Sequence, residues 1–174
     1  TSTDLSSRVA HDGNRAVPPS RWGLTVRQFN QFVATCQSDE ATWASLAAST
    51  ERGKPPGVVD GYQLCEAFVK PFTRGTGCGL ALLLNPENPL EAEVFLSHTW
   101  AADVLEVLDA INDRAADDGR GDDLVVWFCL FANYQCEDGA GPTIAEQLAL
   151  EPFGKVIRSP SLRYMCLLVT SVQD

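Results

Sequence analysis

The second half of the sequence is short of basic residues. Residues 91–174 contain five Lys or Arg and fifteen Asp or Glu, whereas residues 1–90 contain eight of each, so the net charge of -10 falls in the second half. Proteins that bind a nucleic-acid backbone or an anionic membrane surface need basic side chains to contact the phosphates. We therefore expect neither a nucleic-acid partner nor membrane binding.

Long apolar runs and metal-binding patterns are also missing. No stretch approaches the roughly 18–20 apolar residues that a transmembrane helix needs. The six cysteines include no CxxC pair and there are only two histidines, so no metal site is expected. We expect the cysteines to be reduced and packed, as in a cytoplasmic protein. The N-terminus has no apolar signal segment and no initiating Met, so we expect a chain cut from a longer one.

The first ninety residues read as helices joined by loops. Residues 1–59 are expected to form an N-terminal arm and a helical extension, with a helix over 25–36 that Thr25 caps and a second helix over 41–49. Residues 60–90 are expected to be a connecting segment, with a helix over 60–69 that Pro71 ends. The glycine cluster Gly75–Gly79 has two interpretations: a phosphate-binding loop, or a turn before the apolar run 80–84.

From residue 91 the pattern becomes regular. Apolar strands are predicted over 93–97, 124–132 and 162–170, separated by helices over 102–116 and 144–153. This β-α-β-α-β order predicts an α/β fold with parallel strands, the first of which lies between the other two. In such sheets ligands bind beyond the carboxyl ends of the strands.

Five polar or aromatic residues follow the first two predicted strands and are the candidate ligand-binding residues: Ser97, His98, Trp100, Asn133 and Gln135. The histidine and the amides could hydrogen-bond a ligand, and the indole could stack on a base. Four of them also have a structural interpretation: a helix cap for Ser97, a loop tie for His98, core packing for Trp100, and an unusual turn backbone for Asn133. No catalytic residue and no Ser-His-Asp triad can be assigned.

The segments "AEVFLSHTW" and "LVVWFCLFANYQ" resemble a family of domains related to the Toll/interleukin-1 receptor (TIR) domain, and more distantly to heterokaryon-incompatibility domains. The resemblance covers about residues 60–174. It implies a flavodoxin-like parallel sheet in residues 91–174, with the loop 133–142 gating a ligand cleft and mediating assembly. Active TIR domains cleave NAD with a Glu on the helix after the third strand, which here would lie beyond Asp174, so the resemblance implies a C-terminally truncated domain.

These observations predict a cytoplasmic TIR-like module for signalling and protein interaction. Its expected partners are other proteins or further copies of the chain, and a small nucleotide is the candidate ligand. The alternative is a NAD-cleaving hydrolase, with NAD as substrate, whose catalytic Glu follows Asp174.

Overall fold

The computed structural model describes residues 12–168. Four strands are present in this range: β1 (Leu24–Thr25), β2 (Val94–Ser97), β3 (Val125–Phe128) and β4 (Tyr164–Leu167). The α-helices are α1 (Val26–Ser38), α2 (Glu40–Ala48), α3 (Gly61–Leu64), α4 (Lys70–Thr73), α5 (Leu80–Leu84), α6 (Val104–Asp118), α7 (Cys129–Ala132), α8 (Ile144–Ala149) and α9 (Pro152–Ile157). A π-helical turn (Cys65–Val69) joins α3 to α4.

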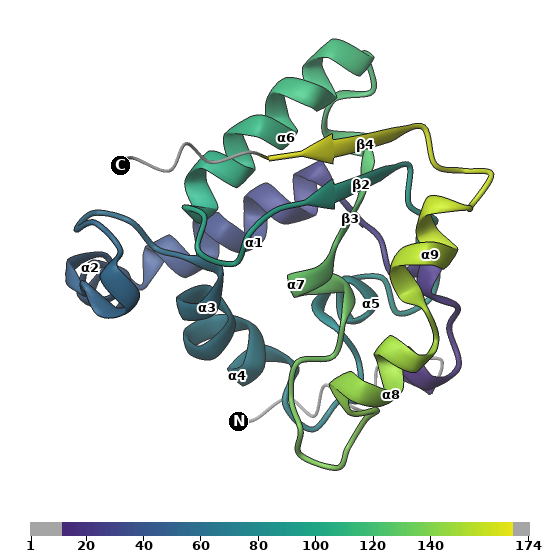
Figure 1. The fold of residues 1–174 in the computed structure, drawn as a ribbon, viewed down its shortest axis with the longest axis horizontal. Coiled ribbons are helices and arrows are strands. Elements are labelled where there is room, and N and C mark those ends of the chain that lie inside the picture. The colour runs from purple at the N-terminus through teal and green to yellow at the C-terminus, as the bar shows by residue number, and fades with distance from the viewer. Residues whose placement is uncertain (1–11, 169–174) are drawn as a thin grey trace.

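The strands form one open, mostly parallel sheet in the order β1-β3-β2-β4. β2 is parallel to both β3 and β4, with Phe95 opposite Trp127 on one side and Met165 on the other. The predicted order of these three strands is therefore confirmed. β1 is antiparallel to β3 and forms one edge of the sheet. β4 forms the opposite edge (Figure 1).

Helices cover both faces of the sheet. On one face, Val94, Leu96 and Phe128 pack in a core shared with α1 and α6. On the other, Phe95 and Trp127 stack at 5.2 Å in a second core that includes Val156 of α9. The fully buried β3 thus lies between two helical layers, which explains its continuous apolar sequence.

Part of the segment expected to be an N-terminal extension belongs to this sheet and its core. Leu24 of β1 pairs with Val126 of β3. Thr25 then caps α1, as predicted: its hydroxyl accepts from the Gln28 amide, and the Gln28 side chain accepts from the Thr25 amide. The apolar face of α1 packs against the sheet, where Phe29 contacts the rings of Phe128 and Phe131.

Two predicted strands differ from the observed ones. The run 124–132 was expected to be one strand, but β3 ends at Phe128 and the chain turns into α7. The run 162–170 was expected to be a buried strand, but β4 is an edge strand in which Met165 and Leu167 are 59% and 72% exposed. The last two residues of that predicted strand, 169 and 170, lie outside the described residues.

Two predicted helices also differ. The helix expected to stop before Pro71 continues through it, because the π-helical turn that precedes Pro71 widens the hydrogen-bonding ring and makes room for the proline. The helix predicted over 144–153 begins at the Thr143 cap as expected, but it ends at Ala149. Glu151 adopts a left-handed backbone (φ 52°) and Pro152 starts α9.

The glycine cluster forms a turn before α5, the second of its two interpretations, and it also packs closely against other backbone segments. A Cβ on Gly79 would lie 2.3 Å from the Ala132 carbonyl oxygen, so only glycine fits there. The Gly79 amide donates to Asn14 Oδ1, and the Gly75 amide donates to Asp138 Oδ2. Because these donors are satisfied within the protein, the cluster is not a phosphate cradle.

Candidate functional site

A cavity of about 270 Å³ lies beyond the carboxyl ends of β2 and β3. Trp100 comes from the loop after β2, Cys129 starts α7, and Asn133 and Gln135 follow α7. The remaining lining residues are Ile144 and Leu148 of α8 and Phe153 of α9. Three of the five predicted ligand-binding residues, Trp100, Asn133 and Gln135, therefore line one cavity.

The position of Trp100 depends on the segment before α3. The Gly61 amide donates to the Trp100 carbonyl at 2.8 Å, and the Val104 amide donates to the Val59 carbonyl at 2.9 Å. A Cβ on Gly61 would lie 3.0 Å from the Trp100 carbonyl oxygen, so glycine permits the close approach. The Tyr62 ring then packs against the indole at a centroid distance of 5.3 Å.

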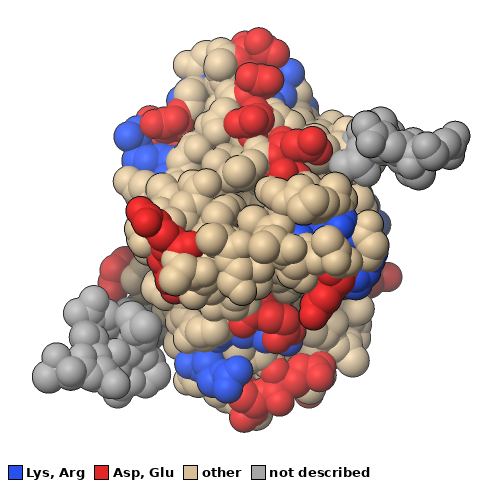
Figure 2. Space-filling model, turned by 90° about the vertical axis from the view of Figure 1, so that its left-hand side faces the viewer, with Lys and Arg blue, Asp and Glu red and all other residues tan. Residues whose placement is uncertain are grey.

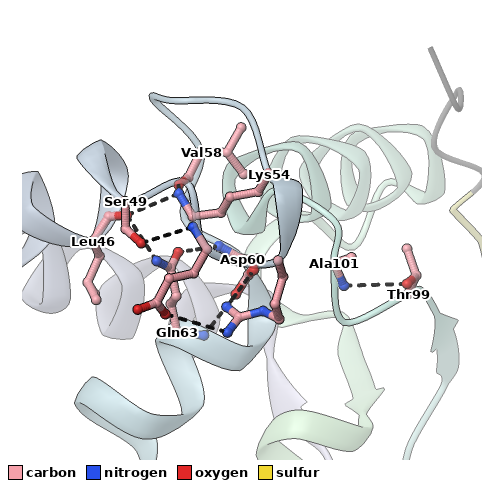
Figure 3. Close-up of polar contacts among 10 residues, drawn as sticks. Leu46, Ser49, Lys54, Val58, Asp60, Gln63, Thr99 and Ala101 are labelled. Atoms are coloured by element: carbon pink, nitrogen blue, oxygen red, sulfur yellow. Dashed lines mark hydrogen bonds and ion pairs between the residues drawn. The ribbon is translucent and has the colours of Figure 1, made fainter. Parts of the chain in front are cut away.

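A buried polar network holds this supporting segment in place (Figure 3). Lys54 Nζ donates to the carbonyls of Leu46 and Val58, and Gln63 Nε2 also donates to Leu46. Figure 3 shows these side chains converging between α2 and α3, beside the loop of Thr99 and Ala101.

Asp60 is the buried acidic residue of this network, and its side chain is 2% exposed. Arg52 donates to both of its carboxylate oxygens, at 2.9 and 3.1 Å. The Gln63 amide donates to Oδ1, so Asp60 also caps α3. Truncating either Arg52 or Asp60 would leave a charge without its partner beside the Trp100 loop.

Asn133 supplies the unpartnered polar group of the cavity. The residue is 5% exposed, and no described residue forms a hydrogen bond with its side-chain amide, although its backbone amide donates to the Cys129 carbonyl at 3.1 Å. Its backbone is ordinary and extended (φ -80°, ψ 146°), so an unusual turn geometry does not account for the residue. The side-chain amide can therefore donate to and accept from a ligand that enters the cavity.

Gln135 and Cys129 complete the polar part of the lining. Gln135 Nε2 donates to the carbonyls of Cys129 and Leu130, which fixes the side chain and leaves Oε1 as an acceptor. Burial raises the pKa of the Cys129 thiol, although the nearby Trp100 side chain opposes the shift by hydrogen bonding to the sulfur. Cys129 is therefore a neutral packing group and not a thiolate nucleophile.

The loop 133–142 is tied down on both sides of the cavity. Tyr134 is fully buried, and its hydroxyl donates to the Asp138 carboxylate at 2.7 Å. Gln147 of α8 is also fully buried; it donates to the Tyr134 carbonyl and accepts from the Tyr134 amide. These contacts fix the backbone immediately after Asn133, so the cavity is largely preformed in this structure.

Ser97 and His98 do not line the cavity. The His98 ring lies against Phe128, at a centroid distance of 4.3 Å, and its Nε2 is buried without a hydrogen-bond partner among the described residues. Burial lowers the pKa of His98 to about 4, so the ring is neutral near pH 7. Ser97 ends β2, and its carbonyl accepts from the Leu168 amide at the β4 edge.

Four lining residues were not predicted: Cys129, Ile144, Leu148 and Phe153. Leu148 and Phe153 belong to the predicted helix 144–153, where their spacing gives no sign of a cavity. The break between α8 and α9 brings them together, and the proline at position 152 was the available signal for that break.

A larger hollow of about 620 Å³ lies between α2 and α3, but its charged side chains have partners. Arg52, the basic side chain in its lining, pairs with Asp60 and lies over the Tyr62 ring at 5.0 Å. Glu66 pairs with Lys70. We therefore take as the candidate site the smaller cavity, whose Asn133 side chain bonds to no other described residue.

Neither a membrane span nor a metal cluster is found within residues 12–168. No helix in this range combines the length and apolar character needed to cross a bilayer. No three His, Cys, Asp or Glu side chains gather there in a way that could hold a metal ion. Comparison with known proteins gives no match to any family model, curated protein or solved structure.

Proposed function

We propose that the chain is a TIR-like module of flavodoxin-like topology, acting in the cytoplasm through protein partners, whose cavity beyond β2 and β3 binds the flat ring of a nucleotide-type ligand. The observation that carries the ligand-binding part is Asn133, whose side-chain amide lines a preformed cavity and forms no hydrogen bond with another described residue. The parallel β3-β2-β4 order supports the topology.

The lining indicates which part of a nucleotide would enter. The Asn133 amide offers a donor and an acceptor, and Gln135 Oε1 offers a second acceptor, which suit the polar edge of a base or of nicotinamide. Trp100 and Phe153 provide aromatic surfaces. No charged side chain lines the cavity, and about 270 Å³ is small for a whole dinucleotide, so any phosphates would remain outside.

Isothermal titration of the chain with NAD, ATP, adenosine and nicotinamide tests this proposal. We expect binding of at least one of them, with a change in tryptophan fluorescence. Asn133→Leu should weaken that binding by about tenfold or more, because the leucine cannot hydrogen-bond the ligand. Asn112→Leu is the matched control, since Asn112 lies on α6 and bonds to Asn30 away from the cavity.

Absence of binding to all four compounds would refute the ligand-binding part, as would unchanged binding by Asn133→Leu. NAD hydrolysis is the alternative activity. None of the seven lining residues is a carboxylate, so the described residues supply no acid for that reaction. Incubating the chain with NAD and measuring nicotinamide release distinguishes an enzyme from a binding module.

A further inference from the structure

Trp100 reaches the cavity from a loop that is supported from outside the cavity. The loop joins β2 to α6, and the segment before α3 contacts it from a distant part of the chain. The Gly61 amide donates to the Trp100 carbonyl, and an isolated antiparallel bridge pairs Asp60 with Asp103. The position of the indole therefore depends on where residues 59–61 lie.

The Asp60 carboxylate is the charged group that holds this supporting segment. It is buried, and it accepts from the Gln63 amide and from the Arg52 guanidinium, which contacts both of its oxygens. Arg52 supplies the positive charge that balances it, because the Gln63 amide is neutral. A buried carboxylate without a counter-charge is unfavourable, so loss of the guanidinium would draw Asp60 towards water and Gly61 with it.

A second connection between Arg52 and Trp100 runs through the Tyr62 ring. The Arg52 guanidinium lies over this ring at 5.0 Å, and the ring packs against the indole at 5.3 Å with an interplanar angle of 52°. Tyr62 is 45% exposed, so the protein core holds it only in part. The guanidinium and the indole therefore help to fix the ring between them.

Apolar packing contributes little to the segment that carries Arg52. Neither α2 nor the short helical turn Glu51–Gly53 contains a buried residue. Arg52 also has a left-handed backbone (φ 58°), which a residue with a side chain rarely adopts. The ion pair with Asp60 is a contact that stabilises this conformation.

The surroundings of Arg52 favour this structural role over the binding of an external anion. Its side chain is 43% exposed beside the larger hollow, but it also lies 3.9 Å from the Glu51 carboxylate, in addition to its bonds with Asp60. Figure 2 shows the side of the molecule that carries α2, on which basic side chains lie next to acidic ones. An incoming anion would have to compete with two carboxylates that are already in place.

We propose that the ion pair of Arg52 and Asp60 positions the Trp100 indole and thereby sets the affinity of the cavity for its ligand, although neither residue of the pair lines that cavity. This names two positioning residues for the ligand site proposed above and rests on that function. The pair acts through the backbone of Gly61 and the ring of Tyr62.

Fluorine NMR of the full chain labelled with fluorotryptophan tests the positioning without any ligand. The chain has four tryptophans, and Trp100→Phe identifies the resonance of Trp100. We expect Arg52→Met to shift or broaden this resonance, while those of the fully buried Trp22 and Trp127 remain and show that the fold is intact. Arg52→Lys keeps the charge and should retain most of the wild-type signal.

Arg163→Met is the matched control. Arg163 pairs with Asp118 at 3.0 Å, and the two side chains are 42% and 1% exposed, against 43% and 2% for Arg52 and Asp60. Asp118 ends α6, whereas Trp100 precedes the start of that helix. Both arginine substitutions should lower the stability of the protein, but only Arg52→Met should change the Trp100 resonance.

Isothermal titration with whichever of NAD, ATP, adenosine and nicotinamide binds the wild type then measures the effect on affinity. Arg52→Met should weaken binding by about 3- to 10-fold, and Arg163→Met should leave it unchanged. Asp60→Asn is a milder second variant, since the asparagine oxygen can still accept from the Gln63 amide while the buried charge is removed. It should change the Trp100 resonance and the affinity in the same direction, by less.

A wild-type Trp100 resonance in both Arg52→Met and Asp60→Asn would overturn the proposal. So would a shifted resonance with unchanged affinity, or an equal loss of affinity in Arg163→Met. If the wild-type chain binds none of the four compounds, the proposed ligand-binding function fails and the control of affinity fails with it. The fluorine spectra would still show whether the ion pair positions Trp100, so the two failures are distinguishable.

Discussion

His98 shows how burial decides the chemistry of a single side chain. The ring lies against Phe128, and its Nε2 is sealed from solvent without a described partner. Burial lowers the pKa from 6.5 to about 4, since a charged imidazolium would lose its hydration there. A neutral ring packed on a phenylalanine stabilises the end of β2, but it is a poor proton donor near pH 7.

The stability of the protein should therefore depend on pH through His98. The unfolded chain binds a proton at this residue near pH 6.5 and the folded chain only near pH 4. The stability that the neutral ring provides is thus complete above about pH 6.5 and is lost as the pH falls towards 4, by up to about 3 kcal/mol. We expect the free energy of unfolding, measured with urea, to decrease from pH 7 to pH 5 by less for His98→Phe than for the wild type. Equal decreases for the two proteins would contradict the assignment.

At the residue scale, the sequence predicted the polar part of the site better than the apolar part. Trp100, Asn133 and Gln135 could be placed because residues that follow parallel strands meet at one edge of the sheet. Phe153 could not, because its place in the lining depends on the left-handed backbone of Glu151. His98 also follows β2, but its ring packs against Phe128 of β3 and does not line the cavity.

Among the elements, helix starts were predictable because their signals are local. Thr25 and Thr143 both form the reciprocal capping boxes that their sequences indicate. The ends of helices were less predictable, as was the continuation of the helix through Pro71. Both depend on contacts between distant segments. α7 is an example: the apolar run 124–132 fits a long strand, yet the chain bends after Phe128, and Phe131 packs against Phe29 and Phe32 of α1.

The cap of α1 provides a prediction at this scale. Thr25→Ala removes the acceptor of the Gln28 amide and one half of the capping box. We expect the free energy of unfolding to fall by about 1 kcal/mol. Thr35→Ala, at an exposed position inside the same helix, should cause a smaller change. Chemical denaturation of the two variants checks this, and equal losses would show that the cap contributes nothing.

For the whole molecule, the N-terminal segment ties distant parts of the chain together. Asn14 is fully buried; its side chain donates to the Ala132 carbonyl and to Gln147, and it accepts from the Gly79 amide. Trp22 is also fully buried, and its indole donates to the Val17 carbonyl. Composition favoured a loosely docked arm here because the partners of Asn14 are all more than sixty positions away in the sequence.

Asn14→Leu should consequently destabilise the entire fold. The substitution removes three hydrogen bonds and leaves the Ala132 carbonyl and the Gly79 amide without this partner, for a loss of about 2–4 kcal/mol. Asp12→Leu is the control, at an exposed position two residues earlier. Thermal and urea unfolding should both show the loss, and a wild-type melting temperature for Asn14→Leu would contradict the role assigned to this residue.

The pairing of β1 with β3 also determines when the protein can fold during synthesis. Leu24 meets a partner, Val126, that is translated about a hundred residues later. Until then α1 has no sheet to cover its apolar face, although its capping box can form at once. The emerging chain therefore carries an exposed amphipathic helix through most of translation, a state that slows folding and that a chaperone for nascent chains would recognise.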